Sequence, residues 1–314
     1  MTIKISVVTT LYQSSTFIGD FYERMVKSLT SIGVNSYEII FVDDGSDDDS
    51  LDIALKISND DKSVKVIQLS RNFGHHKAIL TGLSYAKGEY VFLIDVDLEE
   101  KPELLIKFWE KMHLNNAKGL EIDVVYGVQK QRQGALFEKI TSKFFYKIFN
   151  SLSHVSIPHN SIIARLMTAQ YAIALTRHRD RSVFLGGLAA ITGFNQIELV
   201  CEKSYKGSTT YNFSRKLSQT LNSLLSFSTR PLELILLMGI MVSIISFFFG
   251  FFIFVQALFF SKAVQGWASL IVILSFLSGL TIFSIGAVGM YVAKIFDEVK
   301  DRPYTIIKNK WGFD

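Results

Sequence analysis

Over the first 130 residues, short runs of consecutive apolar residues alternate with longer stretches in which apolar residues recur at helical spacing. A short apolar run bounded by polar residues is typical of a buried strand, and recurrence every three or four positions is typical of a helix. We predict strands over 3–8, 37–42, 64–69, 90–94 and 124–126. We predict helices over 17–31, 49–58, 75–86 and 102–114. Strands that alternate with helices in this way predict a parallel, doubly wound α/β sheet.

The hydrophobic pattern changes after residue 130. Within residues 135–152, Lys139, Lys143 and Lys147 recur every four positions and therefore share one helix face, while apolar residues fill much of the rest. This pattern predicts an amphipathic helix that lies in a membrane interface. A core helix with a solvated lysine edge is the alternative. Residues 213–230, where leucines are flanked by basic residues, predict a second, juxtamembrane helix.

Two long apolar segments follow, over 234–260 and 267–295. Each exceeds the roughly 20 residues that cross the hydrocarbon core of a bilayer, so we predict two transmembrane helices. Lysines and arginines flank the pair on both outer sides, whereas Lys262 is the only basic residue between them. Because basic residues favour the cytoplasmic side, we expect both termini and the α/β domain to face the cytoplasm.

These patterns divide the chain into three parts. We expect a cytoplasmic α/β domain over 1–212, a juxtamembrane helix over 213–230, and a two-helix transmembrane region with a cytoplasmic tail over 231–314. The protein would then be a multi-pass protein of the cell inner (cytoplasmic) membrane, with the bilayer as one of its partners.

The composition agrees with a membrane portion, since 49% of the residues are hydrophobic and 26 are phenylalanine. The net charge of +4 is too small to indicate a nucleic-acid partner. Cys201 is the only cysteine, which excludes an intrachain disulfide. We expect it to fill a buried apolar position rather than to act as a nucleophile.

Two acidic clusters directly follow predicted strands. Asp43 and Asp44 come after the second strand, and Asp95 and Asp97 come after the fourth. Carboxylates at the carboxyl ends of buried parallel strands lie where open α/β sheets bind ligands. Two carboxylates one residue apart can hold a divalent cation, and the cation can hold a diphosphate. The clusters therefore predict a nucleotide and metal site, with ordinary strand-to-helix turns as the alternative.

Several other site patterns are missing from the sequence. No Gly-x-Gly-x-x-Gly follows a predicted strand, no Walker-type Gly-Lys-Ser/Thr loop occurs, and no His/Cys set has zinc spacing. These observations argue against a dinucleotide cofactor, a P-loop NTPase and a zinc site. His75 and His76 are adjacent and would point to different faces of a helix, so we expect them to be polar residues at a helix start.

In its motifs and in their order, the chain resembles glycosyltransferase family 2. Within that family it is similar to the membrane-anchored polyprenyl-phosphate glycosyltransferases, the group that contains dolichol-phosphate-mannose synthases and bactoprenol glucosyltransferases. The resemblance covers nearly the whole chain and includes both apolar segments. The matching stretches are 6–12, 42–46, 70–78, 82–90, 95–103, 165–167, 226–232 and 298–303.

The resemblance implies a GT-A nucleotide-sugar domain with a Rossmann-like fold and an inverting transfer from a nucleotide-sugar donor, by family habit a UDP-sugar. It implies a Mg²⁺ or Mn²⁺ ion held by Asp95, Asp97 and Glu99, although the family more often has Gln at the position of Glu99. The nucleotide contacts would come from Thr10, Tyr12, Asp43, Asp44, Arg71, Asn72, Lys77, Asp95 and Val96. The residues with a catalytic role would be Asp95, Asp97 and Arg165.

The acceptor half of the site departs from the family. Two acidic residues of the family fall on Asn160 and Ile163 here. A sugar hydroxyl needs a general base to become a good nucleophile, whereas a lipid phosphate is largely ionised near neutral pH, with a second pKa of about 6. We therefore predict a polyprenyl phosphate acceptor. The basic residues available to place its phosphate are Arg132, Lys139, Arg165 and Lys203.

Two other interpretations stay open. The chain could be a membrane glycosyltransferase that acts on a saccharide hydroxyl of a lipid-linked or surface polysaccharide intermediate. It could also be a membrane scaffold whose acceptor site has decayed, although the intact pair of Asp95 and Asp97 argues against this. Metal-dependent binding of a nucleoside diphosphate separates an enzyme from a scaffold. Relatives can assemble through their membrane segments, so a homo-oligomer is compatible with the sequence.

Overall fold

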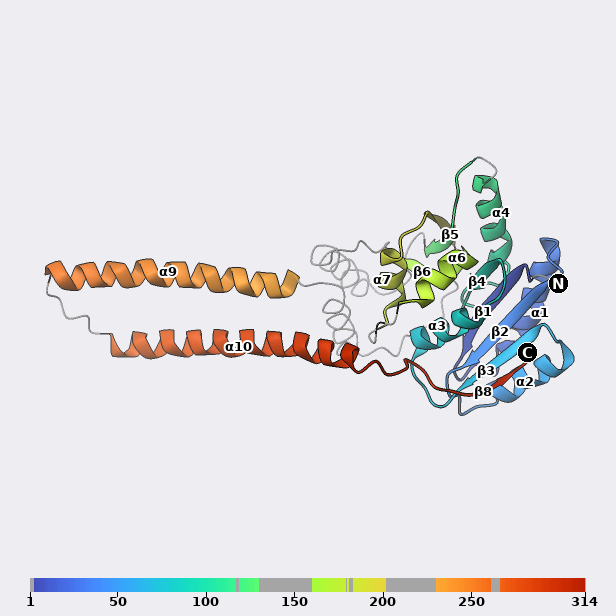
Figure 1. Cartoon of the computed structure of the whole chain (residues 1–314), viewed down its shortest axis with the longest axis horizontal. Helices are drawn as coiled ribbons and strands as arrows, with labels where there is room; N and C mark the ends of the chain where they lie inside the picture. Colours follow the sequence, from blue (N-terminus) through green and yellow to red (C-terminus); the bar gives the residue numbers. More distant parts are fainter. Residues whose placement is uncertain are drawn as a thin grey trace. The chain divides into compact units, whose positions relative to one another are not determined.

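The computed structural model describes residues 3–116, 119–129, 160–178, 180, 183–201, 230–260 and 266–313. The described residues fall into two compact units (Figure 1). The first unit contains those up to 201 and those from 302 onward, and the second contains those from 230 to 301. The predicted amphipathic helix over 135–152 lies outside the described residues, as does the predicted helix over 213–230 except for its last residue.

A parallel sheet forms the centre of the first unit, with strand order β3-β2-β1-β4. Its strands are β1 (Ile5–Leu11), β2 (Tyr37–Asp43), β3 (Val64–Leu69) and β4 (Tyr90–Leu93). The helices that alternate with them are α1 (Ile18–Ser31), α2 (Ser50–Asp60), α3 (His75–Tyr85) and α4 (Leu104–Asn116). The strands and helices predicted up to residue 116 are confirmed.

Burial explains why the central strands are uninterrupted apolar runs. Every residue of β1 is buried, and so is every residue of β2 after Tyr37. A parallel sheet that is covered on both faces requires apolar residues at consecutive positions. The buried residues of α1 instead follow helical spacing, and Phe21 packs its ring edge-on against Phe41 of β2 at 6.2 Å between centroids.

The rest of the sheet is mixed, so the prediction of a wholly parallel sheet is wrong. The additional strands are β5 (Val124–Gln129), β6 (Ser161–Thr168) and β7 (Gln196–Cys201), in the order β7-β5-β6-β4. β6 is antiparallel to both β4 and β5, and β7 is parallel to β5. Because β6 pairs with its predecessor β5 in the antiparallel sense, it separates β5 from the parallel strands. Helices α6 (Ala169–Thr176) and α7 (Leu185–Ile191) lie between β6 and β7 in the sequence.

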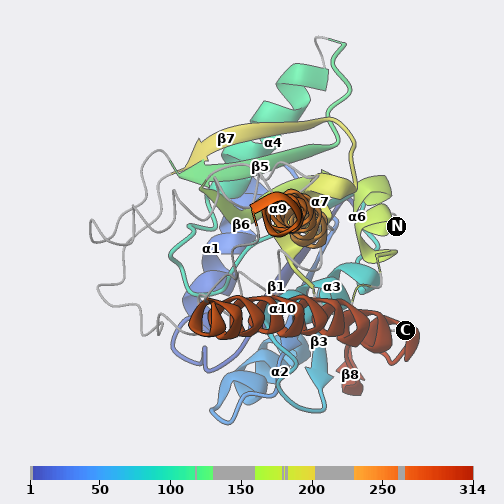
Figure 2. The same cartoon turned by 90° about the vertical axis from the view of Figure 1, so that its left-hand side faces the viewer.

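The far edge of the sheet is formed by the C-terminal residues. β8 (Ile307–Trp311) pairs antiparallel with β3, with Val66 opposite Trp311. From the sequence, these residues are expected in a tail. The ring of Phe313 packs against Tyr85 of α3 at 5.3 Å between centroids. The strands can be followed from β7 at one edge to β8 at the other in Figure 2.

The second unit contains two long helices, α9 (Arg230–Phe260) and α10 (Trp267–Val299). Their segments Leu232–Phe252 and Phe276–Val299 have mean hydropathies of 2.6 and 1.7 and are long and apolar enough to cross a membrane. Many of their large apolar side chains are exposed, including Phe247 at 70%. An apolar surface of this extent needs an apolar environment or a partner to cover it.

Candidate functional site

The predicted donor-site residues lie at one edge of the sheet. β1, β2, β3 and β4 are parallel, so their carboxyl ends meet at the same edge. Thr10, Asp43 and Asp95 come from the ends of β1, β2 and β4, and Arg71 follows β3. The sequence motifs that are far apart in the chain are thus brought to neighbouring loops.

The loop after β1 is hydrogen-bonded to the loop after β2. The backbone N–H of Ser14 donates to Ser50 Oγ at 2.8 Å, and that of Ser15 donates to Asp48 Oδ2 at 3.1 Å. Tyr12 stands between the end of β1 and these contacts and is 49% exposed. Its ring is therefore open to a ligand while the backbone around it is fixed.

The carboxylates of Asp43 and Asp44 are buried and organise the loops after β2 and β3. Asp44 accepts hydrogen bonds from the backbone N–H groups of Phe73 at 2.7 Å and Gly74 at 3.0 Å, and Asp43 accepts one from Ser46 at 3.2 Å. Burial raises the pKa of both carboxyls, and these hydrogen bonds partly offset the rise. In this structure the two residues act on the protein backbone.

Gly45 lets the two loops approach each other closely. Its φ is +72°, a left-handed conformation that favours glycine, and a Cβ there would come within 2.6 Å of Arg71 C and Asn72 N. The guanidinium of Arg71 lies over the ring of Phe73 at 4.3 Å from its centroid. Asp44 and Gly45 therefore define the position of the segment that carries Arg71 and Asn72.

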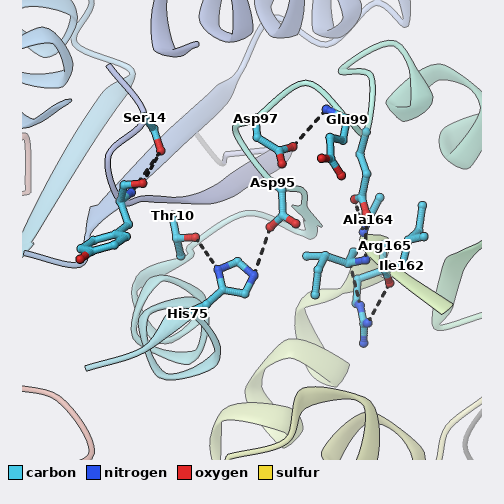
Figure 3. Close-up of polar contacts among 12 residues, drawn as sticks. Thr10, Ser14, His75, Asp95, Asp97, Glu99, Ile162, Ala164 and Arg165 are labelled. Carbon is cyan, nitrogen blue, oxygen red and sulfur yellow. Dashed lines mark hydrogen bonds and ion pairs between the residues drawn. The ribbon is translucent and has the colours of Figure 1, made fainter. Parts of the chain in front are cut away.

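The acidic loop after β4 carries Asp95, Asp97 and Glu99 (Figure 3). Asp97 Oδ1 accepts a hydrogen bond from the backbone N–H of Glu99 at 3.0 Å. Leu98, between them, has a φ of +60°. A bulky residue in this left-handed region costs about 1–3 kcal/mol and is found where the surrounding structure imposes it, often at functional sites.

The donor chemistry of this loop fits a hard divalent cation. Within the part of the chain that the structure describes, no three His, Cys, Asp or Glu side chains converge into a complete metal-binding group. Mg²⁺ usually takes one or two protein carboxylates and completes its shell with phosphate oxygens and water. Carboxylates such as those of Asp95 and Asp97 meet that requirement in a site that also receives a diphosphate.

His75, the first residue of α3, joins two of the strand ends. Its Nδ1 lies 3.0 Å from Thr10 Oγ1, and its Nε2 lies 3.2 Å from Asp95 Oδ1 (Figure 3). Partial burial lowers the pKa of His75, but the hydrogen bond to Asp95 and the neighbouring carboxylates outweigh this and raise it overall. From the sequence, His75 is expected only as a polar residue at a helix start. The position of α3 against β1 and β4, which gives His75 these partners, follows from the topology and not from a motif.

Arg165 lies on β6 and is 5% exposed. Its Nε donates to Ile163 O at 3.1 Å and its Nη2 to Ile162 O at 3.4 Å. Burial lowers the pKa of Arg165, whereas the charges of nearby groups, including Asp95, raise it. Across the described residues, no carboxylate lies close enough to form an ion pair with Arg165, and its Nη1 has no hydrogen-bond partner.

Glu100 fixes the strand that carries Arg165. This carboxylate is buried, and it accepts hydrogen bonds from the backbone N–H groups of Ile163 at 3.2 Å and Ala164 at 2.8 Å (Figure 3). The acidic loop after β4 and the middle of β6 are therefore joined. A buried guanidinium without an ion pair is costly and is well suited to receive a carboxylate or phosphate.

The remaining predicted residues are placed less centrally or not at all. Val96 is buried in the acidic loop, and Lys77 lies half-buried on the first turns of α3. Of the predicted acceptor-phosphate residues, Arg165 is described. The other three, which lie outside the described residues, are Arg132, Lys139 and Lys203.

Comparison with known proteins gives consistent descriptions. Residues 6–171 match the sequence model of the family described as "Glycosyl transferase family 2". A Mycobacterium tuberculosis protein named "Putative glycosyltransferases" is 43% identical over 99% of this chain and 89% of its own. The bactoprenol glucosyl transferase of Shigella phage SfII is 31% identical over 97% of each chain. Among solved structures, mannosyl-3-phosphoglycerate synthase from Rubrobacter xylanophilus aligns with a TM-score of 0.46 at 13% identity, covering 71% of this chain and 72% of that one.

Proposed function

Because the chain belongs to glycosyl transferase family 2 and is a glycosyltransferase with a GT-A-like α/β fold, we propose that it transfers a sugar from a nucleoside-diphosphate donor to a polyprenyl phosphate at a membrane surface. The donor we propose is a UDP-sugar. The relatives named bactoprenol glucosyl transferase, which match along almost the whole chain, support a polyprenyl acceptor.

The donor would bind at the edge where β1, β2, β3 and β4 end. Tyr12 offers an exposed ring to the nucleoside, and the loop that Asp44 and Gly45 hold in place presents Arg71 and Asn72. Asp95, Asp97 and Glu99 are the residues that would hold Mg²⁺ or Mn²⁺. When bound, the cation offsets the negative charge that the leaving diphosphate gains in the transition state.

The acceptor side of the proposal rests on one observation, the buried guanidinium of Arg165. It lies close enough to Asp95 for that charge to act on it, and it has no ion-pair partner among the described residues. An ionised lipid phosphate would satisfy this cation and would need no general base. In an inverting transfer, an oxygen of the lipid phosphate forms the new bond to the anomeric carbon as the bond to the diphosphate breaks on the opposite face.

The two apolar helices support a membrane location for this chemistry. Their length and exposed apolar surface fit two transmembrane spans, and the distribution of lysine and arginine in the sequence favours a cytoplasmic location for both termini. We propose that residues 1–212 form the cytoplasmic catalytic domain, that 213–230 form a juxtamembrane helix, and that 231–314 supply the membrane region. The strand β8 returns part of that last segment to the catalytic sheet.

Replacing the guanidinium tests the acceptor assignment. We expect Arg165→Gln to lower transfer to undecaprenyl phosphate by about tenfold or more, the cost of losing a charged hydrogen-bond donor, while the binding of UDP is retained. Arg177→Gln, which removes the same charge from an exposed position after α6, is the matched control. Unchanged transfer kinetics in Arg165→Gln would exclude Arg165 from the acceptor site.

A further inference from the structure

His75 connects the ends of two adjacent parallel strands through a single side chain. Thr10, at the end of β1, contacts the Nδ1 of the ring, and Asp95, directly after Ile94 at the end of β4, contacts the Nε2. The side chain of His75 is 43% exposed and that of Asp95 is 20% exposed, so both remain reachable from solvent. The contact therefore lies at the surface of the site and not in the core below it.

The chemistry of the two partners defines the hydrogen bonds. An ionised Asp95 can only accept, so the Nε2 of His75 must carry a proton and donate it in either protonation state of the ring. In the neutral ring, Nδ1 is then the acceptor for the Thr10 hydroxyl. This arrangement occupies Asp95 Oδ1, while Oδ2 accepts no hydrogen bond from the residues that the structure describes.

We propose that His75 is a positioning residue for the transfer reaction, which holds the Asp95 carboxylate so that its second oxygen faces the nucleoside-diphosphate site. The inference rests on the proposed donor chemistry and deepens it. Without this contact, the Asp95 side chain could rotate about its χ angles, and part of the binding energy of the donor would be spent on ordering it. Thr10 fixes the ring itself, so the orientation of Asp95 depends on three residues from β1, α3 and the loop after β4.

The adjacent histidine shows that this role belongs to one position. His76 Nδ1 lies 3.2 Å from Val183 O, and its ring lies 6.2 Å from Phe184 between centroids. It contacts the segment before α7 and makes no recorded hydrogen bond to the acidic loop within the described residues. His76→Gln therefore serves as a control for any general effect of altering the start of α3.

Calorimetric titration of the full-length protein in lipid nanodiscs with UDP and Mg²⁺ tests the proposal. We expect His75→Ala to weaken binding about tenfold, the scale expected for losing a hydrogen bond to a charged group. His75→Gln should restore most of the affinity, because its amide nitrogen can donate from a position close to that of Nε2. In an Asp95→Asn background, His75→Ala should change the affinity by less than about twofold, since residues that act through one another are not additive.

The outcomes distinguish the two levels of the argument. If the unaltered protein binds UDP and the His75 and Asp95 effects add independently, the positioning role is wrong and the proposed function stands. The same conclusion follows if His75→Gln is as weak as His75→Ala, or if His76→Gln is equally weak. If the unaltered protein binds neither UDP nor GDP in the presence of Mg²⁺ or Mn²⁺, the proposed donor chemistry fails, and the positioning role fails with it.

Discussion

Thr9 lies in β1 beside the residues of the site, and its side chain is fully buried. Its hydroxyl oxygen has no hydrogen-bond partner among the described residues. Leaving a buried polar group unsatisfied costs about 1–3 kcal/mol, and a strand residue adjacent to a binding site can carry such a cost. The neighbouring Thr10, in contrast, uses its hydroxyl to hold His75.

This difference predicts that Thr9→Val stabilises the protein. Valine has nearly the shape of threonine, favours strands and removes the unsatisfied hydroxyl. We expect the melting temperature to rise by about 2–4 °C, which corresponds to roughly 1 kcal/mol for a domain of this size. Differential scanning fluorimetry in detergent measures the change. Thr10→Val, which removes a hydroxyl that has a partner, should give no increase, and an equal rise in both variants would contradict the explanation.

At the residue scale, the sequence reveals side chains whose position alone indicates their chemistry. Asp43, Asp44, Asp95 and Asp97 follow apolar runs, and their place at the strand ends could be predicted. Their partners in the fold could not. Asp44 binds backbone at Phe73 and Gly74, and the contact of His75 with Asp95 joins residues from separate loops. Such contacts depend on which strands are neighbours, and no local pattern contains that information.

At the scale of elements, the same limit applies to the strands that the sequence did not indicate. β8 reads Ile-Lys-Asn-Lys-Trp, and its three central residues are exposed. Charged residues are common on edge strands because they discourage pairing with another chain, and they also hide the apolar signal of a strand. β6 has a more apolar pattern, but Arg165 lies within it and supplies a site residue. Its antiparallel direction depends on pairing with β5 and β4, which the order of elements alone does not determine.

The pairing of β8 with β3 predicts a stabilising role for the C-terminal residues. Deleting residues 307–314 should expose the edge of β3 and remove the packing of Phe313 against Tyr85. Since each lost hydrogen bond contributes about 1 kcal/mol, we expect the melting temperature to fall by about 5 °C or more. Aggregation should increase, because an unpaired edge can pair with another chain.

Thermal melting and size-exclusion chromatography of the purified protein measure both effects. A chain that ends at Phe313 keeps the strand and the aromatic contact, and it should behave as the full-length protein does. If the deletion of 307–314 left the melting temperature and the elution volume unchanged, β8 would have no structural role.

At the scale of the whole molecule, the proposal requires both ends of the two-helix region to face the cytoplasm. Cysteine labelling can test this orientation because the native thiol is unreactive. Cys201 is 3% exposed, and burial raises the pKa of its thiol to about 11. Near pH 7 the thiol is therefore almost entirely protonated, and its reactivity rises only as the pH approaches that value.

A membrane-impermeant maleimide should label Lys262→Cys, between the two helices in the sequence, in intact spheroplasts. It should label Lys300→Cys, directly after α10, only after the membrane is permeabilised. The unaltered protein should remain unlabelled in both conditions. Labelling of Lys300→Cys without permeabilisation would reverse the orientation and place the catalytic domain outside the cytoplasm.

The most direct test of the proposed function is the identity of the product. The purified full-length protein is incubated with a panel of nucleotide sugars, Mg²⁺ or Mn²⁺ and undecaprenyl phosphate, and the lipids are analysed by mass spectrometry. We expect one donor to yield an undecaprenyl phosphate carrying a single sugar, and we expect Asp97→Ala to abolish that product. The absence of any glycosylated undecaprenyl phosphate with every donor, together with transfer to a saccharide hydroxyl, would contradict the proposed acceptor.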